Sequence, residues 1–255
     1  MLDIRKSHSY VRALFHAMLA EHDDWAYIVS AINKHYANIE FGGMIEKLYQ
    51  LEDEVDRAYI LKIPGECIIV TSGTKSLQGW LRNAQCILDN GWHYGFRKSF
   101  RTILMNPIIE ALRGFNGKIS LYGHSAGSVI SINAAYFIRS SLQRNCESIT
   151  YCGPQTMNKV GKSQCSKAHV CSTTLNIGIH DQVDNIGNLL GGVDYGKIVK
   201  LPDVGDPNIH PDPVLDRFFF GHAPSYVCKS LKVLMQRYNK PQDEFIDEIS
   251  QYAIK

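Results

Sequence analysis

Long apolar runs and an excess of either charge are both missing from this sequence. No stretch of the 255 residues approaches the roughly 20 consecutive apolar residues that span a bilayer, so we expect no transmembrane segment. Lys and Arg together number 27 against 25 for Asp and Glu, and no basic block gathers them. This balance argues against nucleic acid as a partner.

Signals of secretion are missing as well. The opening stretch MLDIRKSHSYVRALFHAML has neither an uninterrupted apolar segment nor a small-residue cleavage site. The sequence contains no Asn-x-Ser/Thr sequon, and its seven cysteines include no CxxC pair. These absences favour a reducing, cytoplasmic setting. A secreted form that has lost its leader is the alternative.

The sequence also lacks cysteines and histidines at the spacing of a metal site. Cys152, Cys165, His169 and Cys171 lie near one another in the sequence, but their spacing fits no common zinc pattern. We interpret these cysteines as reduced structural thiols. No metal and no cofactor are therefore expected.

The segment that points to chemistry is KISLYGHSAGS, residues 118–128. Ile119 and Leu121 alternate with polar or aromatic neighbours, which predicts a strand, and apolar residues at helical spacing follow from residue 126. Between strand and helix lies Gly-His-Ser-Ala-Gly, centred on Ser125. A serine on such a tight turn has its hydroxyl held out at the sheet edge, and the glycines let neighbouring backbones come close. We therefore predict that Ser125 is a catalytic nucleophile.

A serine nucleophile needs a base, and the base needs an acid that fixes its tautomer. In doubly wound hydrolases these groups follow in the order Ser, Asp or Glu, His. Asp181 follows the apolar stretch 175–179 and is the predicted acid, with Asp184 as the alternative. His222 lies downstream, in the turn before an expected helix, and is the predicted base. His210 is the alternative base.

Acyl transfer also needs two donors aimed at the developing oxyanion. One is the backbone N–H of Ala126, the residue after the nucleophile. The other is expected in the loop after an earlier central strand, where Thr74 follows Gly73. Thr74 offers both an N–H and a hydroxyl. The alternative is an ordinary turn threonine.

The alternation of strands and helices predicts a single α/β domain, with a central mixed, mostly parallel sheet covered by helices on both faces. A hairpin turned by Pro64-Gly65 is expected at residues 58–63 and 66–71, and the run 67–70 is apolar on both faces, as in a central strand. Later strands are expected at 148–152, 174–180 and 197–201, and a surface loop at 202–213. Helices are expected at 10–36, 44–56, 76–89, 97–112 with a kink at Asn106-Pro107, 126–143, 224–238 and 242–253.

These motifs resemble those of the fungal-type, class 3 triacylglycerol lipases, over roughly residues 58–226. The likeness is carried, in order, by TSGTKSLQGWLRN (71–83), HYGF (93–96), YGHSAGS (122–128), YCGPQ (151–155), DQV (181–183) and HAPSY (222–226). It implies an α/β-hydrolase fold, the triad Ser125, Asp181 and His222, and an oxyanion hole at Thr74 and Ala126. A helical N-terminal part at 1–57 and C-terminal helices at 227–255 would flank this core.

Three positions depart from the family pattern. Ser72 stands where the family usually has arginine, Gln155 replaces a second arginine, and Ser128 replaces the last glycine of the elbow. They motivate an alternative of another class, a catalytically silent scaffold that binds a lipid or a protein.

The resemblance also implies a mobile lid at residues 76–81, carrying the substrate-facing side chains Leu77, Trp80 and Leu81. Their spacing makes one apolar helix face, which also fits a fixed helix packed on the core. The expected function is that of a serine esterase or lipase that acts on lipid esters, either dissolved or at a lipid–water interface. A phospholipase A1 or a thioesterase would use the same residues.

Overall fold

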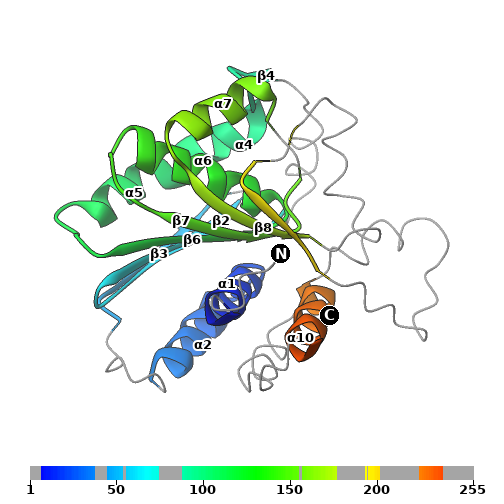
Figure 1. Ribbon diagram of the computed structural model, residues 1–255. Coiled ribbons are helices and arrows are strands. Elements are labelled where there is room, and N and C mark those ends of the chain that lie inside the picture. The colour runs from blue at the N-terminus through cyan, green and yellow to red at the C-terminus, as the bar shows by residue number, and fades with distance from the viewer. Residues whose placement is uncertain are drawn as a thin grey trace.

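A seven-stranded sheet in the order β1-β2-β3-β6-β7-β8-β9 forms the centre of the computed structural model (Figure 1). The first three strands are antiparallel, and β6 to β9 continue the sheet in parallel from β3. The strands are β1 (Lys47–Glu52), β2 (Arg57–Ile63), β3 (Glu66–Thr71), β6 (Lys118–His124), β7 (Glu147–Tyr151), β8 (Cys171–Asn176) and β9 (Lys197–Lys200). A separate two-stranded sheet joins β4 (Leu88–Asp89) to β5 (Trp92–His93). The structure describes residues 7–37, 45–53, 56–74, 88–154, 157–176, 193, 195–201 and 224–237.

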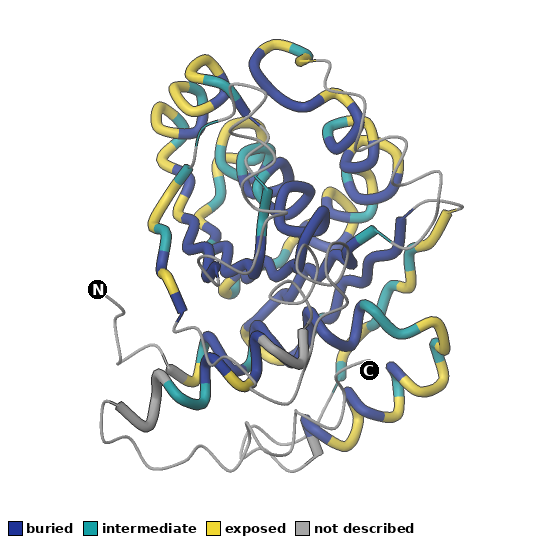
Figure 2. Tube along the Cα trace, turned by 90° about the vertical axis from the view of Figure 1, so that its right-hand side faces the viewer, coloured by how far each residue is buried: buried dark blue, intermediate teal, exposed yellow. Residues whose placement is uncertain are grey.

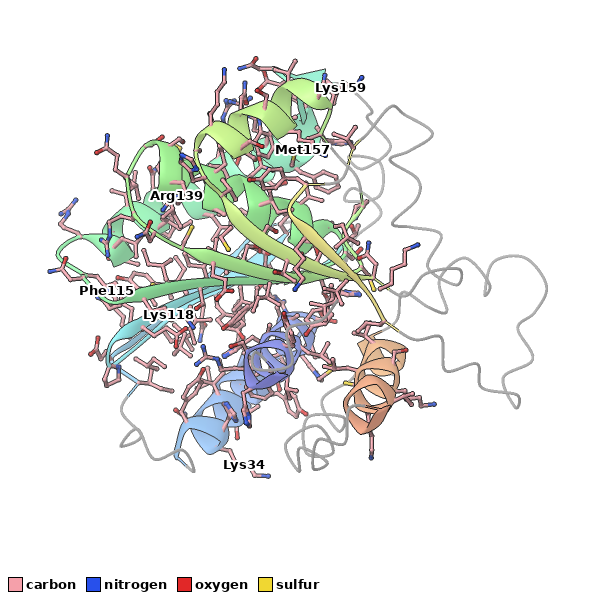
Figure 3. All side chains as sticks on the ribbon, in the orientation of Figure 1. Lys34, Phe115, Lys118, Arg139, Met157 and Lys159 are labelled. Carbon is pink, nitrogen blue, oxygen red and sulfur yellow. The ribbon has the colours of Figure 1, made fainter. Side chains whose placement is uncertain are left out.

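Helices cover both faces of the sheet, as predicted (Figure 1). One face carries α1 (Ser7–Ala20), α2 (Trp25–Ala37) and α10 (Pro224–Arg237). The other carries α4 (Tyr94–Ser99), the π-helical turn η2 (Phe100–Leu104), α5 (Met105–Leu112), α6 (Ala126–Ser140) and α7 (Lys159–Lys167). An apolar cluster fills each interface, and the inner strands between them are largely buried, as the tube in Figure 2 shows. In Figure 3, Lys34 and Lys159 extend outwards on opposite sides of these layers.

The hairpin expected from Pro64-Gly65 is confirmed. β2 and β3 pair up to Ile63 and Glu66, which leaves a two-residue turn with Gly65 at φ 76°. β3 is buried at all six positions between β2 and β6. A strand that faces helices on both sides must be apolar on both sides, which is the pattern of residues 67–70.

The helix expected at 44–56 is wrong, because β1 occupies residues 47–52. Ile45, Leu48 and Leu51 are three residues apart, and this spacing suggested a helix. In the structure Leu48 packs on the α1 side of the sheet, whereas Tyr49 and Leu51 pack on the α6 side. Pairing with β2 along the whole strand decides the outcome, since tertiary context overrides a weak local pattern.

The helix expected at 97–112 is present, but its irregularity is not the expected kink at Asn106-Pro107. Its irregularity is the π-helical turn η2, which lies just before Asn106-Pro107, and Pro107 occupies the first turn of α5. Proline lacks an N–H, so it is best tolerated in a first turn, and the π-turn absorbs the break in the hydrogen-bond ladder.

Four further elements differ from expectation. The helix expected at 10–36 is two helices, α1 and α2, because the chain turns at residues 21–24. β8 begins at Cys171, three residues early, because Ser172, Thr173 and Thr174 are buried within the sheet despite being polar. Residues 88 and 89 form strand β4 and not the end of a helix. Helix α7 was not expected from its polar sequence, and the side chain of Asn158 caps it by accepting from the N–H groups of residues 160 and 161.

Polar side chains are buried between α1 and the sheet. The ring of His16 hydrogen-bonds through Nδ1 to the Tyr59 hydroxyl at 2.7 Å and through Nε2 to the Tyr36 hydroxyl at 2.8 Å. Burial, and then the charges of His35 and Arg12, hold the pKa of His16 well below its usual value. His16 is therefore a neutral member of the core.

Candidate active site

The backbone of Ser125 forms the predicted elbow. Ser125 has φ 54° and ψ −125°, a region that non-glycine residues rarely occupy. It lies between the last residue of β6 and the first residue of α6, and its N–H donates to the carbonyl of Tyr151 on β7 at 2.9 Å. Such strain persists where the surrounding structure imposes it, as in a nucleophile elbow.

The two elbow glycines are required by close backbone approach. A Cβ atom on Gly127 would lie 2.3 Å from the carbonyl oxygen of Thr71, and one on Gly123 would lie 2.5 Å from the carbonyl oxygen of Gly127. Real Cβ contacts do not reach such distances. The α6 helix therefore starts in contact with the end of β3.

Ser128 fits the place where the related pattern has glycine. Its hydroxyl donates to the carbonyl of Tyr151 at 2.8 Å, and a Cβ atom on the facing Gly153 would come within 2.7 Å of the Ser128 Cβ. The missing side chain at Gly153 makes room for Ser128. This departure therefore leaves the elbow intact.

The segment after β3 lies beside Ser125, where the predicted oxyanion loop is expected. A Cβ atom on Gly73 would be 3.2 Å from the Cβ of Ser125, and the half-buried Thr74 follows directly. Ser72, in place of the family's arginine, donates its hydroxyl to the carbonyl of Arg57 at 3.0 Å. Ala126 is buried and is the first residue of α6, so its N–H belongs to the unpaired amino end of that helix.

The parallel strands end at one edge of the sheet. Thr71 pairs with Gly123, His124 with Tyr151, and Tyr151 with Leu175, so β3, β6, β7 and β8 finish side by side. Ligands of such sheets bind outside the carboxyl ends of the strands. The structure therefore places Ser125 and the segment after β3 at the expected edge.

The other predicted site residues lie outside the described residues and stay predictions. They are the acid Asp181 and its alternative Asp184, the base His222 and its alternative His210, and the lid residues Leu77, Trp80 and Leu81. Two observations bear on their surroundings: β8 ends at Asn176, five residues before Asp181, and α10 begins at Pro224, two residues after His222.

A carboxylate at this edge was missed in the sequence. Glu21, the first residue after α1, lies 2.5 Å from the N–H nitrogen of Gly73 and 3.4 Å from Nδ1 of His124, through the same Oε1 atom. His124 is itself buried below the elbow. No motif marks Glu21, because it lies 52 residues before its partner in the chain.

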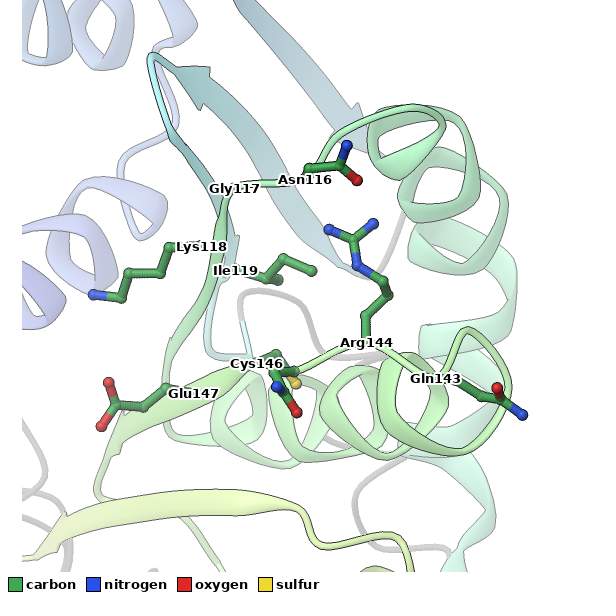
Figure 4. A pocket seen from close by; sticks show the side chains of 9 residues that line it. Asn116, Gly117, Lys118, Ile119, Gln143, Arg144, Cys146 and Glu147 are labelled. Atoms are coloured by element: carbon green, nitrogen blue, oxygen red, sulfur yellow. The ribbon is translucent and has the colours of Figure 1, made fainter.

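A cavity of about 620 Å³ lies at the opposite edge of the sheet. It is lined at the starts of β6 and β7 by residues that include Lys118, Arg144 and Glu147, with Arg144 crossing the opening towards Asn116 (Figure 4). The carboxyl ends of the parallel strands, with Ser125, are at the other edge. This cavity is therefore separate from the candidate active site.

No cluster suited to a metal is found in the described part of the chain. There, no group of three or more His, Cys, Asp or Glu side chains is arranged to hold an ion. Cys152 and Cys165 are buried, whereas Cys171 is exposed. Of the helices that the structure describes, none combines the length and the apolar character needed to cross a membrane.

Comparison with known proteins identifies the fold. No protein-family model matches the sequence, and no curated protein matches it significantly. A lipase from Rhizopus microsporus var. chinensis is 16% identical, with a TM-score of 0.57, and the match covers 78% of this chain and 76% of that one. A triacylglycerol lipase from Penicillium expansum is 12% identical, with a TM-score of 0.58 over 80% and 82% of the two chains. Rhizomucor miehei lipase, solved with its propeptide, is 13% identical, with a TM-score of 0.57 over 76% and 68%. The chain therefore has the α/β-hydrolase fold of the fungal class 3 triacylglycerol lipases.

Proposed function

We propose that this protein is a serine carboxylic-ester hydrolase, a lipase or esterase acting on acylglycerols or related lipid esters. The observation that carries the proposal is the strained backbone of Ser125, at the carboxyl edge of a lipase-like sheet. A strained serine between a strand and a helix has its hydroxyl presented to a substrate. The adjacent segment from Gly73 to Thr74 supports it, because it lies where an oxyanion loop is needed.

The mechanism follows from these roles. His222 takes the proton of the Ser125 hydroxyl as the oxygen attacks the ester carbonyl, and Asp181 orients the imidazole. The N–H groups of Thr74 and Ala126 stabilise the oxyanion. His222 then protonates the leaving alcohol, and water releases the fatty acid from the acyl-enzyme by the same steps. No metal or cofactor takes part.

Labelling with a fluorophosphonate probe tests the proposal directly. The probe reacts only with an activated serine, so labelling of the wild-type protein and loss of labelling in Ser125→Ala support a hydrolase. A properly folded wild-type protein that stays unlabelled supports the silent scaffold and rejects the enzyme.

Substrate class is tested by hydrolysis of p-nitrophenyl esters, triglyceride emulsions and phospholipids. Activity that rises with pH through the histidine pKa, at about 6 to 7, supports His222 as the base. A preference for aggregated over dissolved substrate supports a lid at residues 76–81. Preferential cleavage of phospholipids or thioesters would instead indicate a phospholipase or a thioesterase, which would use the same catalytic residues.

A further inference from the structure

The turn between α1 and α2 is fastened to the segment that follows β3. Glu21 begins this turn, and its side chain is only 14% exposed. The Gly73 N–H donates to Glu21 Oε1 at 2.5 Å, a short bond of the charge-assisted kind. The same oxygen faces His124, the residue before the nucleophile, at 3.4 Å. One carboxylate therefore contacts both the loop and the elbow.

Gly73 lies between this carboxylate and Ser125, with no room for a side chain. A Cβ atom at Gly73 would lie 3.0 Å from Glu21 Oε1 and 3.2 Å from the Cβ of Ser125. A side chain at position 73 would therefore crowd both neighbours, and glycine leaves the room that the Glu21 carboxylate occupies. The hydrogen bond from its N–H to Glu21 is the contact that fixes this peptide.

Arg57 makes a second attachment between the same two segments. Its buried guanidinium donates to the carbonyl of His22 and lies 3.6 Å from the carboxylate of Asp23. Its backbone carbonyl accepts the Ser72 N–H at 3.0 Å. Arg57 therefore holds both segments. Its side chain contacts the two residues that follow Glu21, and its backbone binds Ser72, which precedes Gly73.

We propose that Glu21 is a positioning residue for the oxyanion hole. The role rests on the proposed function, since it concerns the same site. Because the Gly73 N–H is engaged by Glu21, it cannot also serve the oxyanion, and the donor from this loop is the following residue, Thr74. By fixing the peptide before it, Glu21 preorganises the Thr74 N–H relative to Ser125. Preorganised donors contribute to catalysis because they need not reorient during reaction.

The test compares three substitutions at Glu21 by steady-state hydrolysis of a soluble p-nitrophenyl ester. Glu21→Gln keeps an acceptor oxygen at the same reach, whereas Glu21→Asp keeps the charge but is one methylene too short for Gly73. We expect kcat to fall about tenfold or more in Glu21→Asp and Glu21→Ala, with KM within about twofold, and Glu21→Gln to retain most of the wild-type kcat.

Glu66→Ala is a matched control, because Glu66 is also buried and also ties α1 to the sheet. Its carboxylate accepts from Arg12 at 2.8 Å and from Ser120 at 2.5 Å, at the opposite edge from Ser125. We expect a lower thermal midpoint in Glu66→Ala with wild-type kcat. This separates positioning from a general loss of stability.

Three outcomes would overturn the inference. They are wild-type kcat in Glu21→Asp, equal loss of kcat in Glu21→Gln and Glu21→Asp, or a loss in Glu66→Ala as large as that in Glu21→Asp. None of them depends on Glu21→Ala folding. A wild-type protein that neither hydrolyses esters nor reacts with the fluorophosphonate would instead refute the proposed function, and with it this role.

Discussion

Gly127 lies so close to Thr71 that no side chain fits between them. A Cβ atom on Gly127 would be 2.3 Å from the Thr71 carbonyl oxygen, and the Thr71 hydroxyl donates to the Gly127 carbonyl at 2.6 Å. This pair joins the first turn of α6 to the end of β3. It is the reason why the segment after β3 lies beside Ser125.

Replacing Gly127 by alanine should strongly destabilise the protein. The added methyl must push apart two backbones, and we expect the free energy of unfolding to fall by about 3 to 5 kcal/mol. Gly65→Ala is the control, because Gly65 has φ 76° but nothing within 4 Å of its Cβ position. That change should cost only about 1 kcal/mol. Urea titrations measure both, and similar losses would contradict the tight approach at Gly127.

Replacing Ser125 by glycine should stabilise the fold while removing the nucleophile. Glycine tolerates φ 54° and ψ −125°, so the backbone strain of about 1 to 2 kcal/mol is relieved. Ser125→Ala also lacks the hydroxyl but keeps the strain. We therefore expect a higher thermal midpoint for Ser125→Gly than for Ser125→Ala. Equal midpoints would mean that Ser125 is not strained in solution.

Stability should decrease on acidification below the usual histidine pKa. Burial, and then the charge of Arg12, lower the pKa of His35 to about 4. The unfolded chain binds this proton at a pKa of about 6.5 but the folded protein resists it, so the contribution is present above pH 6.5 and is lost as the pH falls to 4. For His35 alone the loss is on the order of 3 kcal/mol.

Urea unfolding between pH 7 and pH 5 measures this dependence. His35→Gln should have a shallower slope of unfolding free energy against pH than the wild type. Identical slopes in the wild type and His35→Gln would show that His35 does not titrate as described.

The cysteines should differ sharply in reactivity. Burial raises the pKa of Cys67, Cys146, Cys165 and Cys228 to about 12, whereas Cys171 is exposed. A buried thiol that stays protonated is a poor nucleophile. Ellman's reagent should therefore react with Cys171 within minutes, and with these four and the equally buried Cys152 only after unfolding.

The seventh cysteine, Cys86, lies outside the described residues, so this assay is made in a Cys86→Ser background. Adding Cys171→Ser should then abolish the fast phase. A fast phase that survives would show that one of the five buried thiols, Cys152 included, is accessible in the folded protein.

Several elements could be predicted from the sequence because short-range chemistry determines them. A two-residue Pro64-Gly65 turn between apolar stretches requires a hairpin, and the central strand is recognised because both of its faces are apolar. The elbow was predictable for a similar reason. Gly123 and Gly127 mark a backbone contact that any side chain would prevent.

The sequence was misleading where the local pattern was weak. Residues 44–56 have helical spacing, yet residues 47–52 form a strand, because β2 offers an open edge and each face of β1 has an apolar cluster to cover. The polar helix α7 was overlooked, since its stability comes from the Asn158 cap and from packing. Asp181 and His222 stay predictions, which rest on their order along the chain and on the resemblance.

The order of amino acids was enough to predict the strand, the tight serine turn and the helix that follow one another from residue 118 to 140, because steric exclusion between neighbouring residues acts within a few positions of the chain. The contact of Glu21 with Gly73 and His124 became visible only in three dimensions. That contact depends on how α1 packs across the sheet. A hydrogen bond between residues so far apart in the chain produces no periodic sequence pattern from which it could be predicted.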